Sequence, residues 1–254
     1  MKPIILFDNR FLDGTITATS EATGFPVANI VDLRTYTFFK ANAAGTCYLT
    51  VDCGAAKSAD ALGIISHNLK TANASIAVES SNDNFTANII ERLAPFTPAS
   101  DKSFMKLFTS ASDRYWRIKI VTASIAAQIA VVMLGQRLTF ERHIYGELFD
   151  PAPEKIEAES STGKTGHLLG SIVKYTQYGI DTEWKNLTDT WVRNTFKPAW
   201  DAHISKFYPY FFAWDIDRFA DDVFFVVYGG NGLSMPYNPI RRNLKLTMIG
   251  VKEE

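Results

Sequence analysis

RYWRIKIVT, residues 114–122, alternates between two kinds of side chain. Successive side chains of an extended strand point to opposite faces, so this stretch has one polar and aromatic face and one apolar face. The first face holds Tyr115, Arg117 and Lys119, and the second holds Trp116, Ile118 and Ile120. Such alternation is typical of a strand that is buried on one side only. We therefore expect a fold built from sheets.

The remainder of residues 1–135 contains further short apolar runs. They recur about every 8 to 12 residues with Gly, Asn, Asp or Ser between them, which is typical of a sandwich or barrel. The aromatic content of 13% also favours sheets over helical bundles. With 254 residues, the chain has room for two modest domains or one large all-β domain. The fold class that we predict is mainly β.

The two cysteines, Cys47 and Cys53, lie in TCYLTVDCG, residues 46–54, which is predicted to be one strand with both thiols on the same face. At roughly 3.3 Å per residue, their Cα atoms are about 20 Å apart. A disulfide requires a separation below about 7 Å. We predict that the cysteines are unpaired and buried as small apolar side chains.

Residues 136–160 are more charged than the preceding part of the chain and contain Pro151 and Pro153. We predict that they form a linker or an extended arm. Residues 161–254 show the order strand, strand, helix, strand, strand, strand, which predicts a small α+β sandwich. The chain is thus expected to have a domain over 1–135, a connection over 136–160 and a domain over 161–254.

One stretch, LTDTWVRNTFKPAWDAHISKF at 187–207, is predicted to be helical. Thr188 is a suitable N-cap residue, and Asp189 would then lie in the first turn. Pro198 lies inside the stretch, where it has no backbone N–H to donate and its ring crowds the preceding turn. We therefore expect one kinked or split helix, bent near Lys197.

AESSTGKT, residues 158–165, fits a relaxed phosphate-loop pattern. That chemistry requires a buried strand before the loop and a helix after it. Charged residues precede this stretch, and Ile172, Val173 and Tyr175 after it favour a strand. We predict instead a hairpin turn around Gly163 and Gly166, with Lys164 in solvent and no nucleotide bound.

Other catalytic and metal-binding patterns are weak. The four histidines are scattered, without a second His or Cys at metal-ligand spacing. DIDRFADD, residues 215–222, lacks the glycine and the closing glutamate of an EF-hand loop, which favours a solvated turn. No Gly-x-Ser-x-Gly motif is present. We expect that the protein is not an enzyme and that it has no catalytic residue, no metal site and no cofactor.

The charge distribution argues against nucleic acid and membrane partners. Net charge is −1 with dispersed Lys and Arg, so neither a basic stripe for nucleic-acid readout nor a polybasic membrane-binding cluster is present. The first ten residues have too few apolar side chains before Asp8 for a signal peptide. The longest apolar stretch, 125–134, is too short to span a bilayer. We expect a protein that is made and kept soluble in a cytoplasm, with no membrane insertion.

Four segments between residues 14 and 135 together resemble the discoidin or coagulation-factor C-type domain, a galactose-binding-like jelly roll. They are ATGFPVANIVDLRTYTFFKA, CYLTVDCGAAKSADALGIISHNL, ASIAVESSNDNF and RYWRIKIV. The resemblance implies a jelly roll with a glycan site in its loops. The residues that it implies for this site are Asn29, Asp32, Arg34, Asn82, Asp83 and Asn84.

Residues 155–254 resemble a domain of long-tailed bacteriophages. The resemblance is carried by SSTGKTGHLLGSIVKYTQYGIDTEWKNLTDTW and FYPYFFAWD, in which a glycine-containing hairpin is followed by a strand, a helix and an aromatic strand. It implies a tail-tube-like sandwich of the kind found in distal tail and tail-tip proteins. The aromatic residues expected to serve assembly or packing are Trp184, Trp191, Trp200, Phe211 and Trp214.

The two resemblances together imply a structural protein of a phage virion. Its expected partners are further copies of itself, in a trimeric or hexameric ring, and other tail proteins. The alternative is a carbohydrate-binding module that attaches to a host-surface glycan. The two hypotheses are compatible, but they place the functional residues in different parts of the chain.

Overall fold

The computed structural model describes residues 2–146, 150, 153–238 and 240–253. The chain is mainly β, with two antiparallel sheets and one bent helix, as predicted. It divides into two compact units. The first unit comprises Pro3–Thr139 and Tyr210–Val223, and the second comprises Lys2, Phe140–Pro209 and Phe224–Glu254. Among the described residues, no helix has the length and apolar character needed to cross a membrane.

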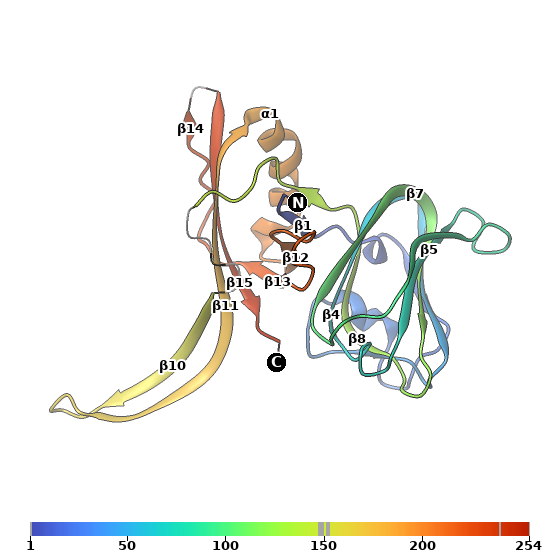
Figure 1. Ribbon diagram of the computed structural model, residues 1–254, viewed down its shortest axis with the longest axis horizontal. Coiled ribbons are helices and arrows are strands. Elements are labelled where there is room, and N and C mark those ends of the chain that lie inside the picture. The colour runs from blue at the N-terminus through green and yellow to red at the C-terminus, as the bar shows by residue number, and fades with distance from the viewer. Residues whose placement is uncertain (1, 147–149, 151–152, 239, 254) are drawn as a thin grey trace. The chain divides into compact units, whose positions relative to one another are not determined.

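The first unit is a β-sandwich jelly roll (Figure 1). Its larger sheet has the strand order β3-β8-β4-β7-β5-β6 with β2 paired to β4, and a smaller group has the order β12-β1-β9. The strands are β1 (Ile4–Leu6), β2 (Thr15–Ala18), β3 (Phe39–Lys40), β4 (Thr46–His67), β5 (Ser75–Ser81), β6 (Ile90–Phe96), β7 (Phe104–Val121), β8 (Gln128–Gly135), β9 (Leu138–Thr139) and β12 (Tyr210–Ala213). Two 3-10 turns, η1 (Arg10–Leu12) and η2 (Val27–Val31), complete it.

The alternation at residues 114–122 is confirmed in β7. Trp116, Ile118 and Ile120 are fully buried, whereas the residues between them are only half-buried. The strand pairs with β4 on one side and with β5 on the other. Its apolar side chains therefore contribute to the core of the first unit, where burial of each large side chain stabilises the fold by roughly 1.5–3 kcal/mol.

Strand β4 is longer than the sequence predicts. The strand predicted over residues 46–54 is the first part of one strand of 22 residues, which continues to His67. Irregular pairing with β7 between Asp52 and Lys57 lets this strand continue past Gly54, which has a positive φ of 72°. Cys47 and Cys53 lie in β4, and both are free and buried, as predicted.

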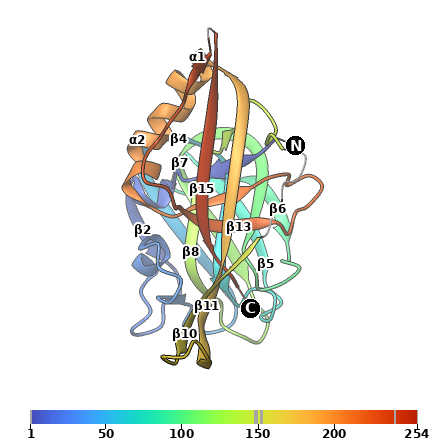
Figure 2. The same ribbon diagram turned by 90° about the vertical axis from the view of Figure 1, so that its left-hand side faces the viewer.

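The second unit contains a sheet with the strand order β10-β11-β15-β13, with β14 paired to β15. Its strands are β10 (Glu154–Thr162), β11 (Leu168–Thr188), β13 (Val223–Tyr228), β14 (Tyr237–Asn238) and β15 (Arg241–Val251). The helical segment consists of α1 (Asp189–Trp191), a π-helical turn η3 (Val192–Phe196), α2 (Lys197–Ala202) and the 3-10 turn η4 (Ile204–Lys206). It lies along one face of the β11–β15 ladder (Figure 2).

The bent helix follows the local chemistry that the sequence predicts. Thr188 is its N-cap, with Oγ1 accepting a hydrogen bond from the Trp191 N–H at 3.3 Å. A π-helical turn precedes Pro198, and within it the Lys197 N–H donates to the Val192 carbonyl. A wider turn at this point relieves the crowding that a proline ring causes in a regular α-helix.

The structure places some element boundaries differently from the sequence prediction. Strand β10 begins at Glu154, so the predicted boundary at 160/161 falls inside the β10–β11 hairpin. Strand β9 lies within the segment expected to be a linker or arm, 136–160. Residues 147–149 and 151–152 of that segment lie outside the described residues. Residues 210–223, expected in the C-terminal domain, belong to the first unit.

Candidate functional site

The most exposed apolar surface of the second unit lies on the β10–β11 hairpin. Strand β11 pairs with β15 only from Gln177 onward, so its residues 168–176 pair with β10 alone. Figure 1 shows this part of the hairpin curving away past the end of β15. We call residues 154–176 the arm.

The two faces of the arm differ in charge. Residues opposite each other in an antiparallel ladder share a face. Apart from Glu154 at its base, one face carries no charged side chain, and we call it the uncharged face. Its members are Ile156, Ala158, Ser160, Thr162, Leu168, Ser171, Val173 and Thr176. The opposite, charged face includes Glu157 and Glu159, and Lys174 pairs with Glu159 at 2.7 Å.

Both faces are open to solvent in the single chain. On the uncharged face, the exposed fractions are 59% for Ile156, 65% for Leu168 and 59% for Val173. Ile156 and Val173 lie at adjacent positions of this face, and the Ser160–Ser171 pair separates Val173 from Leu168. Exposed apolar groups on one face are typical of interaction surfaces. In the described part of the chain, β10 pairs only with β11, so its outer edge also has unpaired backbone groups.

The turn at the tip of the arm is the segment that resembles a phosphate loop. The Gly163 N–H donates to the His167 carbonyl at 2.7 Å, and the Gly166 N–H donates to the Gly163 carbonyl at 2.9 Å. Gly166 has a φ of 82°, which favours glycine. The hairpin turn predicted from the two glycines is confirmed, and a strand rather than a helix follows it.

The loop after η2 contains three of the residues implied as a glycan site. Asn29 Nδ2 donates to the Phe38 carbonyl at 2.8 Å, and the Asp32 carboxylate accepts from the Arg34 N–H at 2.9 Å and from Thr37 Oγ1 at 2.6 Å. Asn29 and Asp32 therefore hold the loop in shape. The Arg34 side chain is exposed and makes no hydrogen bond or ion pair with any described residue.

The same loop presents an aromatic ring that the sequence reasoning did not identify. Tyr36 is 73% exposed, more than the other large apolar or aromatic side chains of the first unit. It lies two residues after Arg34, in a loop whose turn is made by Leu33 at a φ of 63°. A tyrosine between two threonines has no sequence signal that separates it from a core aromatic, so only its exposure identifies it.

The β5–β6 loop contains the other three residues implied as a glycan site. The Asp83 carboxylate accepts hydrogen bonds from Ser81 Oγ and from the backbone N–H groups of residues 86–88. The Ser81 bond is the main reason that the pKa of Asp83 lies below its usual value. Asn84 has a φ of 56°, so it forms part of the turn. Asp83 and Asn84 thus organise the loop.

Asn82 belongs to a polar network beneath this loop. Its Nδ2 donates to Asp113 Oδ1 at 2.7 Å, while Ser80 and Arg92 donate to Asp113 Oδ2 at 2.7 and 2.6 Å. Burial raises the pKa of Asp113, but the hydrogen bonds from Ser80 and Arg92 and the Arg92 charge lower it by more in total. Among the described residues, no hydrogen bond or ion pair joins this loop to the loop of Arg34, so the six residues form two separate groups.

The five aromatic residues expected to serve assembly or packing are mostly interior. Trp184, Trp200 and Phe211 are buried, and Trp184 stacks on Phe140 at a centroid distance of 4.0 Å. Trp191 is half-buried and packs on Phe196 at 6.0 Å, and Trp214 stacks on Phe219 at 4.6 Å. Packing therefore accounts for the three buried residues. The exposed large apolar residues of the arm are mainly aliphatic. A prediction based on aromatic residues therefore does not identify them.

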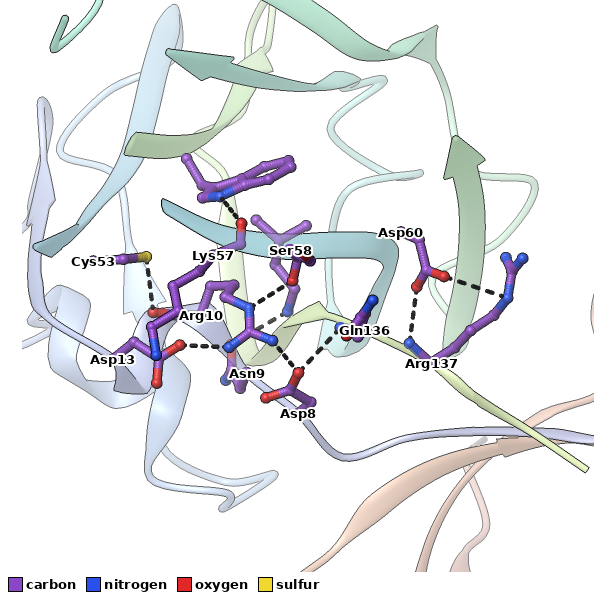
Figure 3. A network of polar contacts seen from close by, with 12 residues as sticks. Asp8, Asn9, Arg10, Asp13, Cys53, Lys57, Ser58, Asp60, Gln136 and Arg137 are labelled. Atoms are coloured by element: carbon purple, nitrogen blue, oxygen red, sulfur yellow. Dashed lines mark hydrogen bonds and ion pairs between the residues drawn. The ribbon is translucent and has the colours of Figure 1, made fainter. Parts of the chain in front are cut away.

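A polar network in the first unit surrounds Arg10 (Figure 3). Its guanidinium donates to the Ser58 carbonyl at 2.8 Å, to Asp13 at 2.6 Å and to Asp8. Burial raises the pKa of Asp8 even though Arg10 lies beside it, and burial also raises the pKa of the nearby Cys53 thiol to about 11. A thiol with such a pKa is not a reactive nucleophile. The network connects η1 to β4, which is a structural role.

The described residues contain no group of three or more His, Cys, Asp or Glu side chains placed to share a metal ion. In the aspartate-rich stretch 215–222, Asp222 accepts a hydrogen bond from the Trp214 indole at 2.8 Å. This contact ties the turn to the aromatic stack of Trp214 and Phe219.

No protein-family model matches the chain, and no curated protein matches it. Solved structures that are similar to part of it include chitosan-binding module 1 of a chitosanase/glucanase from Paenibacillus sp. IK-5, with 19% identity and a TM-score of 0.43 over 50% of this chain and 98% of that chain. A pectin-binding carbohydrate-binding module has 19% identity and a TM-score of 0.40 over 47% and 88% of the two chains.

The CBM32 module of AlyQ, solved with 4,5-unsaturated mannuronic acid, has 21% identity and a TM-score of 0.39 over 50% of this chain and 95% of that chain. The structural neighbours are thus galactose-binding-like β-sandwich modules.

Proposed function

We propose that this chain is a structural subunit of a homo-oligomeric ring, and that the arm joins neighbouring copies. The ring is that of a bacteriophage distal tail or tail tip, the role implied by the resemblance of residues 155–254. The protein is made in the host cytoplasm, enters the virion and acts by assembly, without catalysis or a cofactor. Other tail proteins are its further partners.

The observation that carries this proposal is the exposed uncharged face of the arm. Ile156, Leu168 and Val173 lie on it and are each more than half exposed. Burying a side chain of this size against a neighbouring copy contributes up to roughly 1.5–3 kcal/mol to the free energy of association. A single chain leaves these side chains in water and does not gain this stabilisation. A ring gives every copy an arm and a surface to receive one, so the same contact is repeated until the ring closes.

Val173→Lys is expected to abolish ring formation, because it places a charge in the centre of the uncharged face. The neighbouring change Ile172→Lys is the matched control, since Ile172 is 72% exposed but pairs with Glu159 on the charged face. Light scattering over a range of concentrations measures the native mass. The unmodified protein and Ile172→Lys should form a discrete trimer or hexamer, and Val173→Lys should remain a monomer.

Two results would contradict this proposal. One is a monomer at every concentration of the unmodified protein. The other is a ring that survives Val173→Lys, with both variants showing the same circular dichroism spectrum as the parent.

A second function, binding of a host-surface glycan, is supported by the loop around Arg34 in the first unit. Arg34 is exposed without a partner among the described residues, and the Tyr36 ring is open to solvent. An aromatic face can stack on a sugar ring, and a guanidinium donates several hydrogen bonds in a fixed geometry. Asn29 and Asp32 contribute by holding the loop.

Tyr36→Ala and Arg34→Ala are each expected to weaken glycan binding about tenfold or more, as is usual for central contact residues. A glycan array with the full chain identifies the sugar, and calorimetry measures the loss. Asn84→Gly is the control, because Asn84 lies in the other loop and glycine suits its positive φ. Equal binding by all four proteins, or no saturable binding to any sugar, would remove this second function.

A further inference from the structure

The second unit has an open pocket of about 660 Å³, within the size range of small-molecule sites. The segment 141–145 and the end of β11 form most of its wall. The Tyr145 N–H donates to the Glu183 carbonyl at 2.7 Å, and Arg142 Nε donates to the Asn186 carbonyl at 2.9 Å. These contacts hold the two segments side by side, and Lys2 completes the lining.

The lining is rich in cations. It contains Lys2, Arg142 and Lys185, together with His143. Among the described residues, Lys2 and Arg142 make no ion pair. Lys185 Nζ lies 3.5 Å from the centroid of the Tyr145 ring, and its nearest carboxylate oxygen, on Glu183, is 3.9 Å away.

The carboxylate of the lining is engaged elsewhere. Glu141 accepts hydrogen bonds from the backbone N–H of Thr188 at 2.7 Å and from Thr188 Oγ1 at 2.9 Å. No ion pair of the described residues joins Glu141 to a cation of the pocket. Three positively charged residues therefore line one pocket, and among the described residues only Lys185 has an ion-pair partner, Glu183 at 3.9 Å. Clustered charge of one sign attracts the opposite charge from solution.

We infer that this pocket binds a ligand with two or more oxyanion groups, either phosphates or carboxylates. The cations come from three separate segments around a pocket of about 660 Å³, which has room for more than one oxyanion group. Arg142 provides planar paired donors that match an oxyanion, whereas Lys2 and Lys185 act as point charges. The site lies apart from the arm and does not depend on the ring proposal.

Calorimetric titration at low ionic strength tests this inference, with tripolyphosphate as the phosphate probe and tricarballylate as the carboxylate probe. Saturable binding of one probe per chain is expected, and added salt should weaken it because it screens exposed charges. Arg142→Ala and Lys185→Met should each lower the affinity about tenfold or more. Lys185→Met retains the aliphatic chain beside Tyr145, so it separates loss of charge from loss of packing.

Lys174→Ala is the matched control, because it removes a lysine of the same unit that pairs with Glu159 on the arm. It should bind like the parent. Saturation by only one probe supports the inference and identifies the oxyanion, and saturation by both supports the wider class. No saturation by either probe at millimolar concentration overturns it. If Lys174→Ala and Arg142→Ala weaken probe binding equally, the inference is also overturned. Binding would then depend on the net charge of the protein and not on this pocket.

Discussion

Gly135→Ala is expected to lower the free energy of unfolding by roughly 3 kcal/mol, at the upper end of the range for overpacking a protein interior. A Cβ atom at residue 135 would lie 2.1 Å from the Asp8 carbonyl oxygen and 2.6 Å from its carbon. These are backbone atoms, so no side-chain rotation relieves the clash. To accommodate the added methyl group, either the backbone at Asp8 or strand β8 must shift.

The Asp8 segment is held firmly by its neighbour. Asn9 Nδ2 donates to the Val132 carbonyl at 2.8 Å, and Asn9 Oδ1 accepts from the Leu134 and Phe11 N–H groups at 3.2 Å each. Asn9 is buried, so a displacement that breaks these bonds leaves polar groups without water. Relaxation is therefore costly as well.

Chemical denaturation at neutral pH measures this effect. Gly232→Ala is the control, because no atom lies within 4 Å of the Cβ that it would add. It should change the stability by no more than about 0.5 kcal/mol. A Gly135→Ala protein as stable as the Gly232→Ala protein would show that the approach of Asp8 to β8 is not close in solution.

Acidification from pH 6.5 to 4 is expected to remove about 3 kcal/mol of stability through His67. Its ring is buried, with Nε2 3.1 Å from the Lys102 carbonyl and Nδ1 accepting from the Leu69 N–H at 3.2 Å. These contacts fit a neutral ring that carries its proton on Nε2. Burial lowers the pKa of His67 from 6.5 to about 4, although Asp101 at 3.7 Å and the Lys102 carbonyl act in the opposite direction.

The direction of the effect follows from proton uptake. Below pH 6.5 the unfolded chain protonates His67, whereas the folded protein does so only near pH 4. The contribution is therefore complete above pH 6.5 and is lost as the pH falls towards 4. Asp8 has the opposite dependence, because burial raises its pKa and its charged form is disfavoured in the fold.

His67→Gln isolates the contribution of this residue, because glutamine does not titrate. The variant should be less stable than the parent at pH 7, where it loses the contact of His67 with Phe104, and the difference should shrink towards pH 4. Denaturation curves at several pH values give both free energies. A constant difference between the two proteins over this range would contradict the assignment to His67.

The proposed ring assembly and the proposed glycan binding involve different units of the chain. Val173→Lys is directed at the arm in the second unit, and Tyr36→Ala is directed at a loop in the first unit. Loss of one function with retention of the other would show that the chain combines a structural subunit with a binding module. The pocket at Arg142 adds a third, independent test.

The features that the sequence determined by itself depend on interactions between residues that are close together in the chain. The alternation at 114–122 predicts a half-buried strand, since the side-chain period of a strand is two residues. Thr188 and Pro198 predict the start and the bend of the helix, because a cap and a missing N–H act within one turn. Gly163 and Gly166 predict the hairpin turn, because glycine adopts the backbone conformations of a tight turn without steric cost.

Only the tertiary structure decided which surfaces remain open. Trp184 and Tyr36 are both aromatic, yet one is in the core and the other is in solvent. The apolar residues of the arm resemble core residues in sequence, but among the described residues only β10 pairs with residues 168–176, and these side chains stay exposed. Gly135 meets Asp8, and Arg142 meets Asn186, across long stretches of chain. Whether a side chain is buried depends on residues that are distant in sequence. The periodicity of a short stretch does not identify those residues.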